Sequence, residues 1–296
     1  MNQKPVRKAV IAAAGFGTRF LPQTKAMPKE MLPLVDKPII QHIVEELVEA
    51  GIEDIMIVTG YHKRSIEDHF DQMSAELRSN LRRSGKLDLL EETKRISGLA
   101  NFAYIRQKGL LGNATPVLNA EHLIGDEPFI YAFADDFIDA SPSRFRQMID
   151  LHQNTGSSVL SCIRVEKDFD YDRYGIVAGE ELETGLIKMS TIVEKPGKDA
   201  APSNLASVSG YLLTPDIFDY LKKSQLVVPE GEEFMIQPAM RAMIGDGHEM
   251  LALEIKNGKF YDTGNKLDYL KTVIDFGLKN DKMHDDLMAH LRSIVQ

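Results

Sequence analysis

Two glycines separated by a single residue follow a short apolar run near the N-terminus of this 296-residue chain. The run covers Lys8–Ala13, and Gly15 and Gly17 come just after it. Glycines between a strand and a helix let backbone N–H groups approach phosphate oxygens closely. The segment lacks the third glycine of a dinucleotide fingerprint, and the sequence contains no Gly-Lys-Ser or Gly-Lys-Thr of a P-loop. The pattern therefore favours a phosphate-binding loop of another kind, with a solvated turn as the alternative.

Cations and prolines alternate after this loop. Because proline fixes φ, a proline-rich loop keeps its charged side chains around one place instead of letting them swing freely. Cations held in this way suit a polyphosphate, although a basic surface loop has the same composition. The cations are Arg19, Lys25, Lys29 and Lys37, and the prolines are Pro22, Pro28, Pro33 and Pro38.

Two adjacent carboxylates, Asp135 and Asp136, follow the apolar run of residues 129–134. If that run is a strand of a parallel sheet, its carboxyl end presents these side chains at the edge where such sheets bind ligands. Carboxylate oxygens are typical ligands of Mg²⁺. A strand end followed by a turn gives the same residues. The pattern alone leaves metal binding and a structural turn equally open.

Long motifs carry a resemblance to a known family, the sugar-nucleotide pyrophosphorylases. The stretches Ala14-Gly15-Phe16-Gly17-Thr18-Arg19-Phe20-Leu21-Pro22 and Pro28-Lys29-Glu30-Met31-Leu32-Pro33-Leu34-Val35-Asp36-Lys37-Pro38 are similar to the opening signature of that family. Residues 25–33 are similar to its bacterial members that join UTP to glucose 1-phosphate. Later pieces occur in the family's order: Arg106-Gln107, Leu111-Gly112, Gly125-Asp126-Glu127-Pro128-Phe129, Asp135-Asp136, Val193-Glu194-Lys195-Pro196, Ser203-Asn204-Leu205-Ala206 and Tyr261-Asp262-Thr263-Gly264-Asn265-Lys266.

The resemblance implies a Mg²⁺-dependent nucleotidyltransferase, in which a sugar phosphate attacks the α-phosphorus of a nucleoside triphosphate in line and pyrophosphate leaves. Such an enzyme positions two anions and neutralises the charge that develops. The resemblance implies that the catalytic residues are Arg19 and Lys29 and that the metal ligands are Asp135 and Asp262, with Asp136 competing for the first position. It implies that the nucleotide is contacted by Ala13, Ala14, Gly15, Gly17, Thr18, Glu30, Gln107 and Gly112. It implies that the sugar phosphate is contacted by Gly175, Glu194 and Lys195.

Several positions depart from the family pattern. Asn113 stands where the related uridylyltransferases carry histidine, and Ala134 replaces a proline before the first metal aspartate. Ser209-Gly210 replaces glycine followed by arginine, which removes a cation, and Met235-Ile236-Gln237-Pro238 replaces a Gln-Leu-Thr-Asp run. A thymidylyltransferase, an enzyme for another sugar 1-phosphate, and a weakly active regulatory paralogue therefore remain alternatives. The intact set Arg19, Lys29, Asp135, Lys195 and Asp262 argues against the regulatory paralogue.

The elements that must position these residues form an alternating pattern in the first half. Strand-like runs at 8–13, 54–60, 101–107 and 129–135 alternate with helical stretches, which predicts an α/β fold with a Rossmann-like open, mostly parallel (mixed) sheet flanked by helices. The clearest helix spans 38–50, with Asp36 as the expected N-cap and Gly51 after its end. Longer strand-like runs from Ser157 onward indicate a second sheet layer or an extension that covers the first sheet. Residues from 265 onward are expected to be helical, with apolar side chains facing a core or a partner subunit.

Composition places further bounds on the function. We expect one nucleotidyltransferase domain over 1–296, with a nucleotide half at 1–140, a sugar-phosphate half at 141–264 and C-terminal helices at 265–296. The net charge of −9 argues against a nucleic-acid partner. No stretch is apolar enough for a membrane span or signal peptide, and the one cysteine, Cys162, lies in a strand-like run; both observations indicate a cytoplasmic protein. Family members commonly form homodimers or homotetramers, and the same is expected here.

Overall fold

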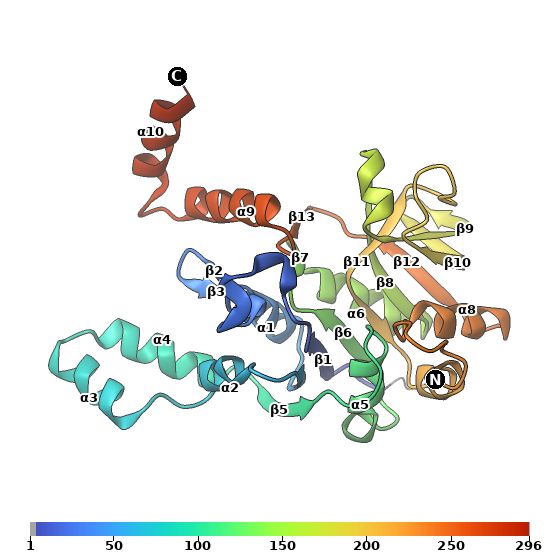
Figure 1. Cartoon of the computed structure of the whole chain (residues 1–296), viewed down its shortest axis with the longest axis horizontal. Coiled ribbons are helices and arrows are strands. Elements are labelled where there is room, and N and C mark those ends of the chain that lie inside the picture. The colour runs from blue at the N-terminus through green and yellow to red at the C-terminus, as the bar shows by residue number, and fades with distance from the viewer. Residues whose placement is uncertain (1–3, 296) are drawn as a thin grey trace.

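The computed structural model describes residues 4–295, and its centre is one sheet of nine strands in the order β5-β4-β1-β6-β11-β8-β12-β10-β9 (Figure 1). The first four strands in this order pair in parallel, whereas the others form a mixed arrangement. This confirms the expected α/β fold with an open sheet flanked by helices. The four parallel strands are β5 (Asn101–Arg106), β4 (Asp54–Thr59), β1 (Lys8–Ala13) and β6 (Phe129–Phe133).

Five of the strands after Ser157 continue this same sheet side by side and do not cover it, so the expectation of a layer or extension that covers the first sheet is wrong. The strand β11 (Leu205–Leu213) pairs antiparallel with β6 and so joins the two halves of the sheet. Every residue of β11 is buried, because helices cover both of its faces. The other strands of this half are β8 (Ser158–Arg164), β9 (Gly175–Glu183), β10 (Leu186–Glu194) and β12 (Met250–Glu254).

A separate two-stranded ribbon lies at the edge of the sheet next to the end of β6. It consists of β7 (Asp136–Ala140) and β13 (Gly258–Asp262), paired antiparallel with Asp262 opposite Asp136. The pairing brings into contact two segments whose paired residues lie 118 (Ala140 and Gly258) to 126 (Asp136 and Asp262) positions apart in sequence. A second short ribbon, β2 (Pro33–Leu34) with β3 (Lys37–Pro38), follows the cation-rich loop.

Helices cover both faces of the sheet over two buried apolar clusters. The helix α1 (Ile39–Glu49) shows the expected apolar stripe, but Asp36 is not its N-cap. Pro38 takes that position without a side-chain hydrogen bond, because Lys37 and Pro38 are already engaged in β3. The remaining helices are α2 (Arg64–Phe70), α3 (Ala75–Arg83), α4 (Leu87–Ser97), α5 (Thr115–Ile124), α6 (Arg144–Thr155), α7 (Ile217–Gln225), α8 (Gln237–Gly245), α9 (Lys266–Lys279) and α10 (His284–Val295).

The C-terminal helices extend from the body of the molecule, and α10 points away from it in Figure 1. Val273 and Phe276 of α9 pack against the core, whereas Leu267 and Leu270 on the same helix are exposed. None of the described residues of α10 is buried. The expected subunit contact through these helices stays a prediction.

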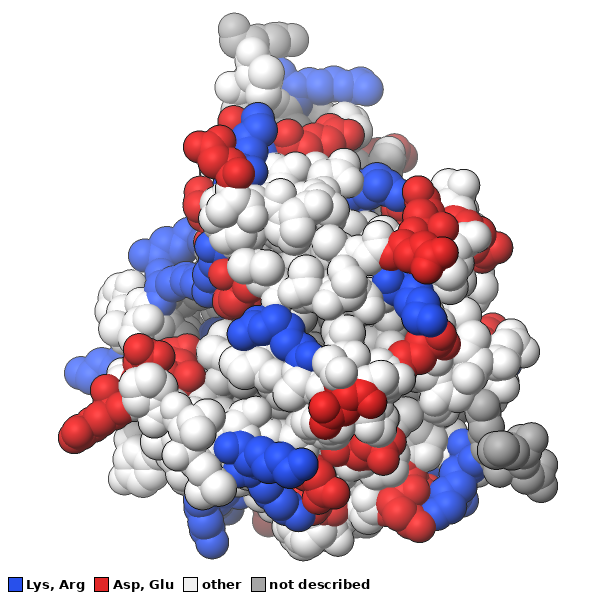
Figure 2. All heavy atoms as spheres, turned by 90° about the vertical axis from the view of Figure 1, so that its right-hand side faces the viewer, with Lys and Arg blue, Asp and Glu red and all other residues white. Residues whose placement is uncertain are grey.

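The charged side chains at the surface and the single cysteine can now be placed in the structure. On the face drawn in Figure 2, Lys and Arg side chains are scattered among Asp and Glu. Within residues 4–295 no helix is long and apolar enough to cross a membrane. Cys162 is fully buried in β8, and burial raises the pKa of its thiol well above the ordinary value. A thiol in this state is a poor nucleophile.

Candidate active site

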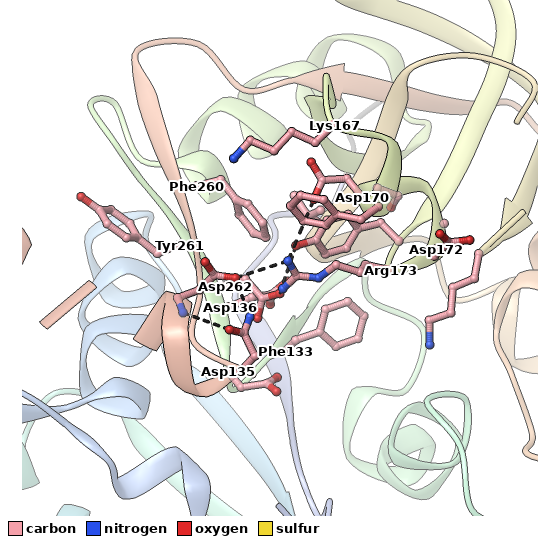
Figure 3. A pocket seen from close by; sticks show the side chains of 18 of the residues that line it. Phe133, Asp135, Asp136, Lys167, Asp170, Asp172, Arg173, Phe260, Tyr261 and Asp262 are labelled. Carbon is pink, nitrogen blue, oxygen red and sulfur yellow. Dashed lines mark hydrogen bonds and ion pairs between the residues drawn. The ribbon is translucent and has the colours of Figure 1, made fainter. Parts of the chain in front are cut away.

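A cleft of about 1020 Å³ lies at the carboxyl end of β6, between the β7–β13 ribbon and the outer strands β9 and β10. Open α/β sheets bind ligands at this edge. Figure 3 shows Arg173 in the middle of the cleft, with Asp135, Asp136 and Asp262 close by. Six of the residues expected from the sequence line it: Arg19, Asp135, Gly175, Glu194, Lys195 and Asp262.

The glycine loop lies against Lys29, which belongs to a short 3-10 helix, Lys29–Met31. A Cβ added at Gly15 would meet Lys29 Cε at 3.8 Å and Nζ at 3.9 Å. Gly17 has a φ of 67°, and a Cβ there would lie 3.3 Å from both Lys29 Cβ and Thr24 Cβ. Only glycine fits this left-handed position without strain. The loop therefore exposes its backbone beside a lysine, as a phosphate site requires.

Asp135 is held by Lys29 and by the segment after β13. The Lys29 ammonium forms an ion pair with Asp135 Oδ2. Burial alone would lower the pKa of Lys29, but the Asp135 carboxylate raises it above the ordinary value. Burial alone would raise the pKa of Asp135, but the Lys29 ammonium holds it below the ordinary value. Thr263 donates both its N–H, at 3.0 Å, and its hydroxyl, at 2.6 Å, to the Asp135 carbonyl. The two chain segments that carry Asp135 and Asp262 are thereby fixed to each other.

Asp262 converges on the same point as Asp135. A Cβ added at Gly264 would lie 3.0 Å from Asp262 Oδ1, 3.3 Å from Asp135 Oδ2 and 3.4 Å from Arg19 Nη1. The two carboxylates therefore face a common small space beside the guanidinium of Arg19. Two carboxylates together with phosphate oxygens and water suit Mg²⁺, which keeps several non-protein ligands. Within residues 4–295 no group of three or more His, Cys, Asp or Glu side chains has the geometry to hold a metal alone.

Arg173 occupies the other side of Asp262. It forms ion pairs with Asp262 and, at 3.3 Å, with Asp268, and Tyr174 donates its hydroxyl to Asp262 Oδ2 at 3.0 Å. The carboxylates Asp262 and Asp268 raise the pKa of Arg173 even though burial opposes them. Arg173 therefore neutralises the acidic wall of the cleft.

Asp136 is the weaker candidate for the metal. Its Oδ2 accepts a hydrogen bond of 3.0 Å from Ser209 N, which directs the carboxyl toward β11. Burial, and then the neighbouring Asp135 carboxylate, raise the pKa of Asp136 to about 7. A group that favours its neutral form is a poor ligand for a divalent cation.

The three residues that were expected to contact the sugar phosphate, Gly175, Glu194 and Lys195, lie together in the cleft. A Cβ added at Gly175 would lie 3.2 Å from Glu194 Oε2, so the carboxylate packs directly on this glycine. Lys195 Nζ lies 3.7 Å from Glu194 Oε1. Lys195 adopts a φ of 46°, which a residue other than glycine rarely takes and which occurs most often at functional sites. Burial raises the pKa of Glu194 above its ordinary value.

The remaining residues that were expected to contact the nucleotide lie around the ends of β1 and β4. A Cβ added at Gly60 would lie 2.9 Å from the Ala14 carbonyl, and Gln107 N donates to Thr59 O at 2.9 Å. These segments, which include Ala13 and the exposed Thr18, lie at the edge of the sheet without lining the cleft itself. Glu30 is fully buried in an ion pair of 2.6 Å with Lys63, so its carboxylate faces the interior.

Three residues of the site were not selected from the sequence: Arg173, Gln237 and Gly264. The signal for Arg173 was its position two residues before Gly175, and the signal for Gln237 was its departure from the family pattern. Position 210, where the family has arginine, cannot carry a side chain with this backbone. Its φ is 138°, and a Cβ would lie 2.5 Å from the Tyr131 carbonyl.

The fold is that of a nucleotide-binding α/β enzyme, and the cations and paired carboxylates of the cleft suit phosphate-bearing substrates together with a divalent cation. Residues 8–276 match the model of the nucleotidyl transferase family, and the chain belongs to this family. It is 45% identical to a UTP–glucose-1-phosphate uridylyltransferase of Bacillus subtilis (strain 168), over 99% of this chain and 98% of the relative.

Two solved structures resemble this one over nearly the whole chain. A UDP-glucose pyrophosphorylase complexed with UDP-glucose superposes with a TM-score of 0.83 and 39% identity, covering 93% of this chain and 100% of the other. A UTP-bound enzyme of the same kind from Acinetobacter baumannii superposes with a TM-score of 0.85 and 36% identity, covering 98% of this chain and 99% of the other.

Proposed function

We propose that the protein joins UTP and glucose 1-phosphate to give UDP-glucose and pyrophosphate. The observation that carries this proposal is one cleft with two differently built ends. One end has Arg19 and the carboxylates Asp135 and Asp262, with Lys29 paired to Asp135 and lying against the glycine loop; the other has Glu194 and Lys195 beside Gly175. Relatives at 44% and 45% identity over nearly their full length bear the name of this activity.

The reaction is an in-line displacement at the α-phosphorus by an oxygen of the sugar phosphate. The bond from the α-phosphorus to the bridging oxygen of pyrophosphate breaks as the new P–O bond forms, and no covalent enzyme intermediate is needed. Catalysis then consists of positioning and charge neutralisation. Arg19 and Lys29 bind the triphosphate, because Lys29 Nζ lies beside Gly15 of the glycine loop and Arg19 Nη1 lies beside Gly264, next to the two carboxylates. The guanidinium of Arg19 is suited to paired phosphate contacts.

Asp135 and Asp262 hold Mg²⁺ in this proposal. The ion, when bound, neutralises phosphate oxygens and aligns them for attack. Lys29 and Arg173 occupy the two carboxylates in the structure described here. Both cations then become free to contact phosphate oxygens once a metal takes over the carboxylates. Lys29 is the nearer of the two to the glycine loop.

Glu194 accepts hydrogen bonds from hexose hydroxyls, and Lys195 binds the phosphate of the sugar. A backbone contact from Gly175 completes this end. On the nucleotide side, the uracil contacts are assigned to Gln107, whose amide both donates and accepts hydrogen bonds. The backbone of Ala13, Ala14, Gly15, Gly17 and Thr18, together with Glu30 and Gly112, surrounds the rest of the nucleotide.

The test is a panel of UTP, dTTP and other nucleoside triphosphates crossed with several sugar 1-phosphates, followed by release of pyrophosphate with Mg²⁺ present. We expect the fastest turnover with UTP and glucose 1-phosphate and at least 100-fold less, as an order of magnitude, in a Lys29→Met control. Nucleotide binding without pyrophosphate release from any pair refutes the proposal and supports a regulatory paralogue. Faster turnover with dTTP makes the protein a thymidylyltransferase.

The location of the protein, the division of the chain into two halves and the oligomeric state belong to the same proposal. A cytoplasmic location is part of this proposal; it is supported by the use of a nucleoside triphosphate and by the single buried Cys162, which can form no internal disulfide. The half at 1–140 contributes the glycine loop, Arg19, Lys29 and Asp135, the half at 141–264 contributes Asp262 and the sugar-phosphate residues, and the C-terminal helices at 265–296 are proposed as the contact of a homodimer or homotetramer.

A further inference from the structure

Gln237 is the first residue of α8, and its side chain reaches the sugar end of the cleft. It is only 3% exposed, and its Nε2 donates a hydrogen bond of 2.7 Å to Glu194 Oε2. The other carboxylate oxygen, Oε1, faces Lys195 Nζ at 3.7 Å. Each oxygen of Glu194 therefore has its own partner, and the plane of the carboxylate is fixed.

The amide of Gln237 is held in one orientation at a cost. Its Oε1 is buried and has no hydrogen-bond partner within residues 4–295. A buried acceptor without a partner is unfavourable, whereas a hydrogen bond to an ionised carboxylate is among the stronger ones in proteins. Rotating the amide by half a turn would place oxygen against oxygen. The contact with Glu194 thus determines the orientation of the amide, and the unpaired oxygen is tolerated for it.

The helix that carries Gln237 is aligned on the strand that carries Glu194. One helical turn further along α8, Arg241 Nη1 donates to the carbonyl of Ile192 at 2.9 Å. Residues four apart lie on the same face of a helix. The two contacts lie along β10, so α8 has little freedom to slide or rotate relative to Glu194.

The start of α8 is also tied to the loop that follows β5. Asn113 Oδ1 accepts a hydrogen bond of 2.9 Å from Ile236 N, immediately before Gln237. Phe234 N donates to Leu111 O at 2.7 Å, and Ala114 N donates to Phe234 O at 3.0 Å. These hydrogen bonds connect the loop that contains Gly112 to the start of α8, where Gln237 contacts Glu194. Asn113 and Gln237 are both departures from the family pattern, and they belong to one network.

We propose that Gln237 is a positioning residue for the sugar subsite and that Asn113 anchors it. Gln237 holds the Glu194 carboxylate so that its remaining lone pairs accept hydrogen bonds from adjacent hexose hydroxyls. The inference rests on the proposed function, since it assigns Glu194 to the sugar. It goes further in naming the residues that determine where the carboxylate lies in this chain.

The first test replaces Gln237 with methionine, which keeps the length and volume but removes the donor. Binding of UDP-glucose and of UDP is measured by calorimetry for each protein, and Gln147→Met serves as the matched control. Gln147 lies on α6, and its side chain forms hydrogen bonds with Pro142 and Lys256, which do not line the cleft. We expect Gln237→Met to bind UDP-glucose about 10-fold more weakly and UDP within about twofold of the unchanged protein.

The second test replaces Gln237 with glutamate. Two ionised carboxylates about 2.7 Å apart repel each other, which raises the pKa of the pair, so a proton shared between them restores the lost bridge as the pH falls. The groups that face Glu194 and titrate or carry charge are Lys195, Glu233 and Tyr211. They are common to all variants, so affinities are expressed relative to the unchanged protein at each pH. We expect the relative affinity of Gln237→Glu for UDP-glucose to rise between about pH 8 and about pH 6, while that of Gln237→Met stays flat.

The results test the positioning role of Gln237 separately from the proposed reaction. Equal weakening of UDP and UDP-glucose in Gln237→Met, or UDP-glucose binding like that of the unchanged protein, overturns the inference. A double-mutant cycle with Asn113→Ala is expected to be non-additive, and strict additivity removes the anchoring role. The binding measurements need no turnover, so absent pyrophosphate release alongside the expected binding pattern refutes the reaction and leaves the positioning role intact.

Discussion

Adding a single methyl group at Gly264 tests the convergence of the metal carboxylates. The substitution Gly264→Ala changes no charge and removes no hydrogen bond from the site. Gly264 N donates to Asp262 Oδ1 at 2.8 Å, and alanine keeps that N–H. The φ of Gly264 lies outside the left-handed region, so alanine is compatible with the backbone. Any effect therefore comes from the space that the methyl group occupies.

The size of the effect follows from three contacts. The methyl carbon would lie 3.0 Å from Asp262 Oδ1, 3.3 Å from Asp135 Oδ2 and 3.4 Å from Arg19 Nη1, so its neighbours must move by a few tenths of an ångström. Mg²⁺ requires near-ideal octahedral geometry at about 2.0–2.1 Å. Small displacements of positioning groups cost up to about 100-fold in rate. We expect kcat to fall by about 10- to 100-fold, which is about 1.4–2.7 kcal/mol, with more Mg²⁺ needed for half-maximal rate.

The assay is pyrophosphate release from UTP and glucose 1-phosphate over a range of Mg²⁺ concentrations, together with thermal unfolding. Gly245→Ala is the matched control, because a Cβ at Gly245, the last residue of α8, meets no atom within 4 Å. Gly245→Ala is expected to unfold at or above the midpoint of the unchanged protein, since alanine reduces the freedom of the unfolded chain, whereas in Gly264→Ala the close contacts offset that gain while the protein still folds. Unchanged kcat and Mg²⁺ dependence in Gly264→Ala would show that the two carboxylates do not share this space.

Three further substitutions test other parts of the site and the fold. Lys195→Ala is expected to raise KM for glucose 1-phosphate at least 10-fold, as an order of magnitude, and KM for UTP far less; the reverse pattern would move Lys195 to the nucleotide side. Asp135→Asn should abolish Mg²⁺-dependent turnover in a protein that still folds by circular dichroism, and full activity would move the metal to Asp136. Burial lowers the pKa of His42 from 6.5 to about 4, so the unfolded chain binds this proton more readily. Stability is then complete above about pH 6.5 and falls toward pH 4 by up to about 3 kcal/mol. In His42→Gln, urea unfolding should lose that part of the pH dependence, and an identical pH profile in both proteins would contradict it.

The sequence alone determined the elements and motifs whose signals are local. The strands β1, β4, β5 and β6 lie where the alternating pattern predicted them, because apolar runs bounded by turn residues are encoded over a few neighbouring positions. The glycine loop was also identified locally, since Gly17 needs its left-handed φ whatever surrounds it. The order of the later motifs indicated the family that the comparisons then showed.

Only the tertiary structure decided which distant residues meet. The pairing of β7 with β13 brings Asp262 to Asp135, and the packing of α8 on β10 brings Gln237 to Glu194. The register of a pairing depends on contacts between segments far apart in sequence, and no local pattern specifies it. The same reason explains why Asp36 does not cap α1, where the β2–β3 ribbon occupies the approach to the helix. Local periodicity specifies each element, whereas the chemistry of the cleft depends on the long-range contacts that bring those elements together.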